Sequence, residues 1–395
     1  MSTSISQHYD ICIQGSGIVA RTLALLLARE RFRVALVGSA KAESTGEKHD
    51  VRAYALNAAS KNLLESLRVW PDAAHATPVL GMQVHGDTSG KVNFSAAEHG
   101  SEALAWIVDV PALEAQLLQA VKYQPLITVF EQVASAHLHD ANTTIRRDLT
   151  VICEGKNSAT RDELGVEFDV TPYHQHAIAA RLTGTLPHGN RAMQWFKNGE
   201  ILAFLPLSEP NQTHPGNSVA LVWSVAEERA KTLMALNADE FATEVAAHSE
   251  HALGVMTLYS ERAVWPLQLA QADKWIGKHP ELGSWALAGD AAHTVHPLSG
   301  QGLNLGLADV AELASVLAAV KGKEYWRSVG DVKLLRRYER ARKLDAIALG
   351  TVTDGLQQLF ARSESPLQAI RNWGMQGFER SGGLKQWVTK KAMGL

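Results

Sequence analysis

The chain is poor in cysteine and has no long apolar run, and both absences exclude classes of protein. Only Cys12 and Cys153 occur among 395 residues, each in a run typical of a buried strand. We therefore expect no disulfide framework and no thiolate metal site. No stretch has eighteen uninterrupted apolar residues, and the first residues lack a basic segment followed by a long apolar one. We expect neither a membrane-spanning helix nor a secretion signal, and hence a cytoplasmic protein.

Charge is unevenly distributed along a chain of ordinary globular composition. The formal net charge is −3, but residues 331–395 carry twelve Lys/Arg against six Asp/Glu, a local excess of +6 that leaves −9 for the rest. Such a basic segment favours an anionic membrane surface, an acidic protein partner or a plain solvated helix face, and the sequence leaves these open. We expect a cytoplasmic location or a peripheral one on the inner membrane face, and no nucleic-acid partner.

A nucleotide-binding pattern opens the chain. An apolar run, a glycine-rich turn, a helix and a second β-rich run follow one another, at Tyr9 to Gln14, Gly15 to Ala20, Leu23 to Arg29 and Arg33 to Val37. Gly15 permits the tight turn, Gly17 lets the backbone approach a pyrophosphate, and Ala20 lets the helix pack closely on the strand. The N-terminus of the helix then faces the phosphates. This order predicts a βαβ unit that binds a dinucleotide.

The segment after the βαβ unit is less regular. The acidic residue that usually ends the second strand is replaced by Gly38, and Glu43 lies in the loop beyond it. Arg52 either pairs with a phosphate or is an ordinary surface arginine. The apolar positions that follow recur at helical spacing and predict one helix containing Leu56, Leu63, Leu64 and Leu67.

The middle of the chain changes from a βαβ pattern to alternating strands. Two β-rich runs in residues 79–95 surround Asp87-Thr88-Ser89-Gly90, which predicts a hairpin. Residues 112–121 predict a helix and 127–153 predict strands. Long alternating runs, such as Ile201 to Leu207 and Ser218 to Val225, then fill residues 174–265. We interpret this insertion as a mainly antiparallel substrate domain.

A second glycine-rich segment follows a buried strand, Trp285 to Ala288. The strand delivers Asp290 to a loop, where its carboxylate can accept hydrogen bonds from a ribityl chain. Gly300 and Gly302 open the next helix, so that its N–H groups and positive dipole end can face an electron-rich flavin edge. His293 and His296 lack nearby carboxylate or cysteine ligands, and we assign no metal. No hydrolase elbow or P-loop lysine pattern is present.

The segment GDAAHTVHPLSGQGLNLGLADV resembles the signature of FAD-dependent aromatic hydroxylases, most closely the ubiquinone-biosynthesis branch. The resemblance covers nearly the whole chain, through DVRAYALNAASKNLLESLRVW, QWFKNGEILAFLPL and LLRRYERARK. It implies a group A flavin monooxygenase, in which NAD(P)H reduces FAD, O₂ forms a C4a-hydroperoxide and one oxygen passes to a phenolic ring of a polyprenylated ubiquinone precursor. No catalytic side chain is assigned. The residues expected to touch FAD are Gly15, Gly17, Ala20, Arg52, Gly289, Asp290, Pro297, Gly300, Gly302, Leu303 and Asn304.

The expected fold class is α/β, with a Rossmann-like FAD-binding domain, a mainly antiparallel β-sheet substrate domain and a helical C-terminal segment. We assign residues 1–75, 100–172 and 266–330 to a discontinuous FAD-binding domain. Residues 76–99 and 173–265 form the substrate domain, and 331–395 the helical segment. The chain is too long for one ordinary core, which agrees with this division.

Four positions depart from the family pattern. Gly38 replaces the acidic residue, and Glu154-Gly155 replaces an Asp-Gly pair expected to serve both FAD and nicotinamide. Glu114 stands where relatives often have Arg or Gln, and an arginine frequent after Pro266-Leu267 is missing. A carboxylate near a pyrophosphate is unfavourable unless it turns away or is screened. These changes predict loosely held FAD.

Two alternatives to the ubiquinone-pathway hydroxylase follow from the same sequence. One is a hydroxylase of a soluble aromatic such as a benzoate, which would need an arginine for the free carboxylate. The other is a non-catalytic, flavoprotein-like subunit of a biosynthetic complex, with the nucleotide site decayed at Gly38 and Glu114. The intact segment from Gly289 to Asn304 argues against this second alternative.

Overall fold

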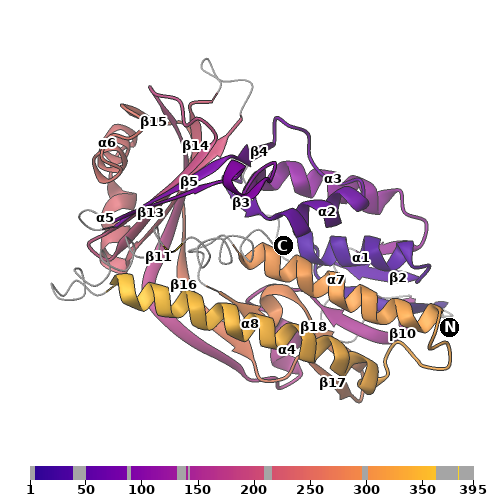
Figure 1. Ribbon diagram of the computed structural model, residues 1–395. Helices are drawn as coiled ribbons and strands as arrows, with labels where there is room; N and C mark the ends of the chain where they lie inside the picture. Colours follow the sequence, from indigo (N-terminus) through magenta and orange to yellow (C-terminus); the bar gives the residue numbers. More distant parts are fainter. Residues whose placement is uncertain are drawn as a thin grey trace.

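A computed structural model of the chain describes residues 5–38, 50–86, 90–130, 139–140, 143–208, 216–295, 301–361 and 381. Pro297 and Gly300 of the expected cofactor site lie outside the described residues, as do Glu43 and His296. Within the described residues, the strands form sheets of seven, nine and three strands. Figure 1 shows the seven-stranded and nine-stranded sheets on opposite sides of the molecule. The predicted α/β fold class is confirmed.

The seven-stranded sheet is mostly parallel. Its order is β17 (Ile276–His279), β18 (Gly283–Leu287), β10 (Thr143–Ile152), β1 (Ile5–Gln14), β2 (Val34–Val37) and β8 (Ile127–Phe130), with β9 (His139–Asp140) paired to β10. The strands from β18 to β8 pair in parallel, while β17 and β9 pair antiparallel. Every residue of β2 is buried, as expected for a strand covered on both faces. This is the Rossmann-like arrangement that the opening motif predicts.

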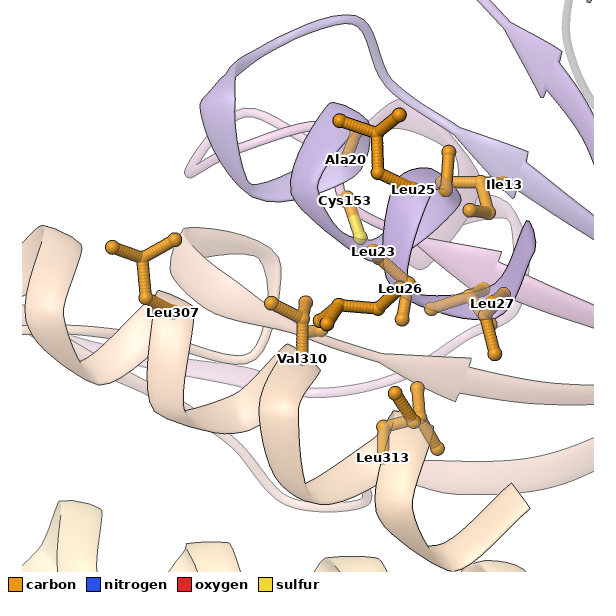
Figure 2. Packing of buried hydrophobic residues seen from close by; sticks show 14 of the residues in the cluster. Ile13, Ala20, Leu23, Leu25, Leu26, Leu27, Cys153, Leu307, Val310 and Leu313 are labelled. Atoms are coloured by element: carbon orange, nitrogen blue, oxygen red, sulfur yellow. The ribbon is translucent and has the colours of Figure 1, made fainter. Parts of the chain in front are cut away.

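Helices α1 (Ile18–Arg29) and α7 (Gly302–Lys321) share one apolar core with this sheet. Figure 2 shows Leu23 and Leu26 of α1 near Val310 of α7. Each fully buried leucine contributes about 1.5–3 kcal/mol. By length and composition α7 could cross a membrane, but half of its most apolar window is buried inside the protein. It is packed here as a core helix between α1 and α8 (Val332–Ala361).

The nine-stranded sheet is almost wholly antiparallel. Its order is β19 (His293–Thr294), β16 (Ala263–Ala272), β11 (Phe168–Gly184), β14 (Ser218–Ala226), β13 (Glu200–Leu207), β12 (Arg191–Lys197), β5 (Gly81–His85) and β6 (Lys91–Ser95), with β15 (Met256–Leu258) paired to β11. Among the described strands of this sheet, only the β5–β12 pairing is parallel. The pairing of β5 with β6 confirms the predicted hairpin, although residues 87–89 of its turn lie outside the described residues.

The insertion also contains two helices that the alternating pattern did not predict, α5 (Glu227–Ala235) and α6 (Ala238–His248). Asn237 and Glu240 form a reciprocal capping box that starts α6. Phe241 on α6 is fully buried against Trp223 of β14, with ring centroids 6.3 Å apart. The helices therefore cover one side of the sheet, and the prediction of a mainly antiparallel insertion did not include them.

The small sheet corrects a second prediction. It consists of β3 (Ala53–Leu56), β7 (Ala105–Asp109) and β4 (Ala76–Val79), with β7 in the centre. Leu56 therefore lies in a strand, and helix α2 (Ala58–Ser66) begins only after it. Asn57 caps α2 by accepting a hydrogen bond from the Ser60 N–H, which ends the strand and starts the helix.

The remaining described helices connect these parts. They are α3 (Val110–Lys122), the short α4 (Ala159–Glu163), and two 3₁₀ turns, η1 (Ala97–His99) and η2 (Gly289–Ala291). The prediction of a helix over residues 112–121 is confirmed by α3. Both cysteines are buried and free, and burial raises the pKa of the Cys12 thiol to about 12. The bounds of the two domains stay a prediction.

Candidate functional site

The turn after β1 accepts only glycine at its first position. Gly15 has φ +129°, and its N–H donates to the Val37 carbonyl at 2.9 Å. A Cβ on Gly15 would lie 2.3 Å from the Cys153 carbonyl oxygen. A side chain at this position would therefore strain the backbone and collide with β10's continuation. The tight turn predicted from the sequence is present.

The N-terminus of α1 faces open space. Gly17 is its N-cap, without a side-chain hydrogen bond, and a Cβ on Gly17 would meet nothing within 4 Å. The first N–H groups of a helix lack internal partners and lie at the positive end of its dipole. They can therefore bind an anion such as a pyrophosphate. Ala20 is fully buried and lets α1 pack against its neighbours.

The second glycine-rich segment lies beside the first. A Cβ on Gly306 of α7 would come within 2.9 Å of Val19 Cγ2, and one on Gly289 within 3.3 Å of Val19 Cγ1. These glycines bring η2 and α7 against the start of α1. A Cβ on Gly302 would meet no atom of the described residues within 4 Å, so these residues also leave space at the N-terminus of α7. Two motifs almost 290 residues apart in sequence thus lie against each other.

Asp290 is the carboxylate of this site. Its residue surface is exposed, while both neighbours in η2, Gly289 and Ala291, are buried. Desolvation by the surrounding protein raises the pKa of its carboxyl, an effect that the charges of His293 and Lys156 oppose. An exposed carboxylate surrounded closely by protein is suited to accept hydrogen bonds from the hydroxyls of a bound ligand.

Arg52 is already held by a neighbouring carboxylate. Its Nε donates to Asp50 Oδ1 at 2.8 Å, and its second terminal nitrogen (Nη2) to Asp50 Oδ2 at 2.5 Å. Burial would raise the pKa of Asp50, but the hydrogen bonds and charge of Arg52 lower it overall. A phosphate at Arg52 would therefore have to share the guanidinium with Asp50 or displace it.

Asn304 uses its side chain to tie α7 to the segment after Arg52. Its Oδ1 accepts hydrogen bonds from the Asn57 N–H at 3.0 Å and the Ser60 hydroxyl at 2.7 Å. Its Nδ2 donates to the Ala55 carbonyl at 2.8 Å. The neighbouring Leu303 is partly buried against the main core. A cofactor contact at Asn304 would therefore use its backbone.

Glu154 accepts hydrogen bonds at the start of the short helix α4. It accepts hydrogen bonds from the Ser158 hydroxyl at 2.7 Å, the Thr160 N–H at 3.0 Å and the Thr160 hydroxyl at 2.9 Å. These contacts hold the N-terminus of α4, where a negative charge is favourable. Arg161 of α4 is buried, stacks over the Phe168 ring at 3.7 Å and donates to the Ala291 carbonyl at 3.4 Å. Through Arg161 the Glu154 turn supports η2.

Two other departures from the family pattern are Gly38, after β2, and Glu114, on α3. Among the described residues, the nearest neighbour of a Cβ on Gly38 would be the Phe130 carbonyl oxygen at 3.7 Å, an ordinary van der Waals contact. Burial lowers the pKa of Arg21 on α1, and the charge of Glu114 on α3 opposes this. Glu114 also acts on Arg52.

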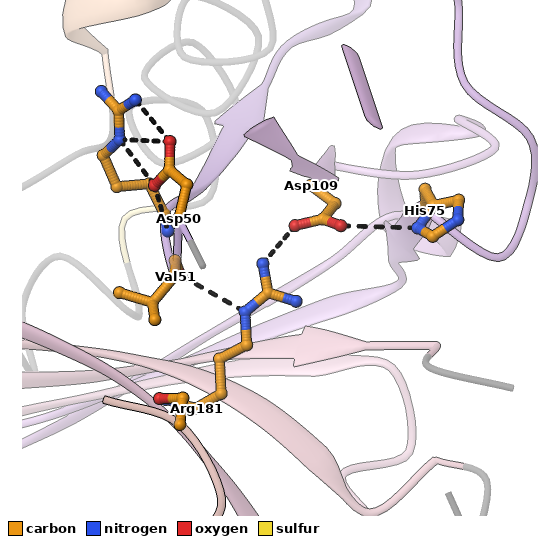
Figure 3. A network of polar contacts seen from close by, with 7 residues as sticks. Asp50, Val51, His75, Asp109 and Arg181 are labelled. Carbon is orange, nitrogen blue, oxygen red and sulfur yellow. Dashed lines mark hydrogen bonds and ion pairs between the residues drawn. The ribbon is translucent and has the colours of Figure 1, made fainter. Parts of the chain in front are cut away.

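Sequence reasoning missed one polar network, shown in Figure 3. Arg181 of β11 donates through Nε to the Val51 carbonyl at 3.4 Å and through a terminal nitrogen to Asp109. Asp109 also lies 3.4 Å from His75 Nδ1. Arg181 and Asp109 side chains are only 14% and 15% exposed. The network joins the nine-stranded sheet to the segment that carries Arg52. An arginine within an alternating strand gives no sequence signal for such a contact.

The described residues contain no group of three or more His, Cys, Asp or Glu side chains placed to hold a metal ion. The open helix N-termini at Gly17 and Gly302 instead suit an extended ligand with a pyrophosphate. Asp290 between them suits its hydroxyl groups. The residues present therefore fit the FAD that the sequence predicts.

Comparisons with known proteins agree with this geometry. A profile of the family described as "FAD binding domain" matches residues 8–350. The chain is 32% identical to 3-demethoxyubiquinol 3-hydroxylase from Escherichia coli, over 99% of this chain and 100% of that protein. It is 29% identical to ubiquinone hydroxylase UbiL from Rhodospirillum rubrum, over 98% and 89% of the two chains.

Solved structures share the fold at lower identity. PqsL from Pseudomonas aeruginosa, in complex with 2-aminobenzoylacetate, has a TM-score of 0.74 at 20% identity and covers 93% of this chain and 100% of its own. The p-nitrophenol 4-monooxygenase PnpA from Pseudomonas putida has a TM-score of 0.74 at 14% identity, with 98% of both chains covered.

Proposed function

The chain belongs to the FAD-binding monooxygenase family, and we propose that it hydroxylates the aromatic ring of a polyprenylated ubiquinone precursor with NAD(P)H and O₂. It is an FAD-dependent aromatic hydroxylase, which excludes the non-catalytic alternative. The observation that carries the finer proposal is the full-length similarity to two proteins named as ubiquinone-pathway hydroxylases. That similarity includes both glycine-rich segments of the site.

The proposed role of each residue follows from the site. The N–H groups of α1 at Gly17 bind the pyrophosphate of FAD, Gly15 shapes the turn before them, and Asp290 accepts hydrogen bonds from the ribityl hydroxyls. The N-terminus of α7 at Gly302 faces the flavin and stabilises negative charge on its reduced form. FAD supplies the redox chemistry, and the protein binds it, orients the phenol and excludes water. Pro297 and Gly300 stay predictions from the motif.

The test compares two substrate classes. The purified protein, saturated with FAD, receives NADH or NADPH and either a short-chain prenylated phenol or a hydroxybenzoate. We expect substrate-dependent oxidation of the nicotinamide and a hydroxylated product, identified by mass spectrometry, with the prenylated phenol. Product formed only from the hydroxybenzoate would overturn the proposed substrate and leave the hydroxylase itself intact.

Gly38→Glu is expected to tighten FAD binding. A carboxylate at the end of β2 can accept hydrogen bonds from the ribose hydroxyls of the adenosine. One such charged hydrogen bond is worth about 1.5–3 kcal/mol, so the dissociation constant should fall about tenfold or more. Fluorescence titration of the apoprotein with FAD measures it. The control is Gly322→Glu, at an open position at the far end of α7. It adds the same charge and should leave the dissociation constant for FAD unchanged.

We propose that α8 attaches the enzyme to an anionic membrane surface. One exposed stripe of this helix begins with Lys333, Arg336 and Arg340 and continues with Leu344, 70% exposed, and Ile347, 43% exposed. Exposed basic side chains are attracted to anionic lipid headgroups, and exposed apolar side chains beside them can enter the boundary between headgroups and acyl chains.

Co-sedimentation with vesicles tests this attachment. We expect binding to phosphatidylglycerol-containing vesicles, at least tenfold weaker for Arg336→Glu/Arg340→Glu, since each basic residue contributes about 1 kcal/mol. Lys231→Glu on α5, also exposed, is the control. Equal binding by all three proteins would rule out α8 as the attachment site.

A further inference from the structure

Asp309 lies within the second glycine-rich segment but is not among the residues expected to touch FAD. Asp309 of α7 is fully buried, with an exposed fraction of 0%. Its Oδ2 accepts hydrogen bonds from the Gly289 N–H at 3.0 Å and from His293 Nε2 at 2.6 Å. Its Oδ1 accepts one from Arg342 Nε of α8 at 2.9 Å. A carboxylate can only accept, so His293 carries its proton on Nε2.

The two residues bound by Asp309 Oδ2 stand on either side of Asp290. Gly289 precedes it, with φ +63°, and His293 follows three positions later. The same turn is held by Arg161 at the Ala291 carbonyl, and the His293 ring is stacked on Trp275 at 5.0 Å. The backbone around Asp290 is therefore fixed on both sides, while the Asp290 side chain remains exposed.

Helix α8 completes the arrangement. The Arg342 side chain is only 9% exposed and neutralises the buried charge of Asp309, and one of its terminal nitrogens also donates to Asp345 at 2.7 Å. One turn before it, the Tyr338 hydroxyl donates to the Leu287 carbonyl at 2.7 Å. Both ends of the segment from β18 to β19 thus depend on α8, which also carries the basic stripe.

We propose that Asp309 is a positioning residue for FAD: by holding Gly289 and His293 it directs the Asp290 carboxylate toward the cofactor, and Arg342 keeps Asp309 in place. The proposal rests on the role of Asp290 proposed above. It concerns cofactor binding alone, so it can fail or succeed whatever the substrate proves to be.

Asp309→Asn disrupts the hydrogen bonds to Gly289, His293 and Arg342 with almost no change in side-chain shape. The amide has one acceptor oxygen and one NH₂ donor, where the carboxylate has two acceptors. The groups around it are the Gly289 N–H, the His293 ring and the Arg342 guanidinium. In either orientation the NH₂ faces a donor that cannot change, Gly289 or Arg342. The turn must therefore shift or lose a hydrogen bond.

The experiment measures the affinities of apoprotein variants for FAD and, separately, for ADP. ADP occupies the pyrophosphate site at Gly17 and has no ribityl chain. We expect Asp290→Ala and Asp309→Asn each to weaken FAD binding about tenfold, the loss of one charged hydrogen bond, and to leave ADP binding unchanged. Because Asp309 acts through Asp290, the double variant should bind FAD no more weakly than Asp290→Ala alone.

Two variants on α8 test its part. Arg342→Gln should resemble Asp309→Asn. Arg337→Gln, on the same helix, breaks an ion pair with Glu324, which precedes α8, and should bind FAD normally. Additive losses in the double variant would overturn the proposal. So would an equal loss of FAD and ADP binding by Asp309→Asn, which indicates general unfolding, or undiminished FAD binding by Asp290→Ala.

Discussion

Gly15→Ala is expected to reduce both the stability of the protein and its affinity for FAD. The new Cβ would lie 2.3 Å from the Cys153 carbonyl oxygen, at a backbone with φ +129°. A strained φ costs about 1–3 kcal/mol, and overpacking costs about as much again. The turn can relax only by moving β1 away from its neighbour, which also displaces the N-terminus of α1.

Gly17→Ala is the matched variant, because the same methyl group two residues later should affect FAD alone. Its Cβ meets no atom within 4 Å in the part of the chain that the structure describes. Alanine at an N-cap costs at most about 1 kcal/mol relative to glycine. The methyl group does occupy the space through which the pyrophosphate approaches, and losing one charged hydrogen bond there weakens binding about tenfold or more.

Thermal unfolding of the apoproteins and fluorescence titration with FAD measure these two effects separately. The expected pattern is a midpoint lowered much more by Gly15→Ala than by Gly17→Ala, and a raised FAD dissociation constant for both variants. Normal FAD binding by Gly17→Ala would contradict the assignment of this helix N-terminus to the pyrophosphate.

Arg181→Met is the second substitution for which we expect a large loss of stability. It removes one partner of a largely buried ion pair and leaves Asp109 without its main counter-charge. Breaking such a pair costs about 3 kcal/mol or more. It also frees the Val51 carbonyl beside Arg52, so we expect weaker FAD binding as well as a lower midpoint in urea unfolding.

Two further variants make this prediction specific. Arg181→Met/Asp109→Leu removes both charges and should recover part of the lost stability. Lys197→Met, in the nine-stranded sheet, breaks an exposed ion pair with Glu250. Such a pair contributes less than about 1 kcal/mol to stability. If Arg181→Met lowered the free energy of unfolding as little as Lys197→Met, the Arg181 network would not be holding the nine-stranded sheet to β7.

Local patterns predicted the parts of the site that depend on backbone geometry. Gly15, Gly17 and Gly302 were proposed as site residues because a tight turn or an open helix N-terminus requires glycine at a fixed distance from a strand or helix. The strand that presents Asp290 was equally visible, since its apolar run ends at Gly289. In each case the physical cause lies within a few residues of the motif.

Contacts between distant segments were not predictable in this way. Arg181 meets Asp109 across 72 residues, and Arg342 meets Asp309 across 33. Nothing near either arginine distinguishes it from a solvated side chain. Leu56 was wrongly placed in a helix because its spacing fits one, while the pairing of Ala53–Leu56 with β7 decides the conformation. Helices α5 and α6 were missed because the strands around them dominate the local pattern.

The most direct test of the account is hydroxylation of a prenylated phenol under ¹⁸O₂ by the protein loaded with FAD and supplied with NAD(P)H. We expect a product heavier than the substrate by one ¹⁸O atom, formed only when FAD, nicotinamide and phenol are all present. Oxygen derived from water, or nicotinamide oxidation with no hydroxylated product from any phenol, would contradict it.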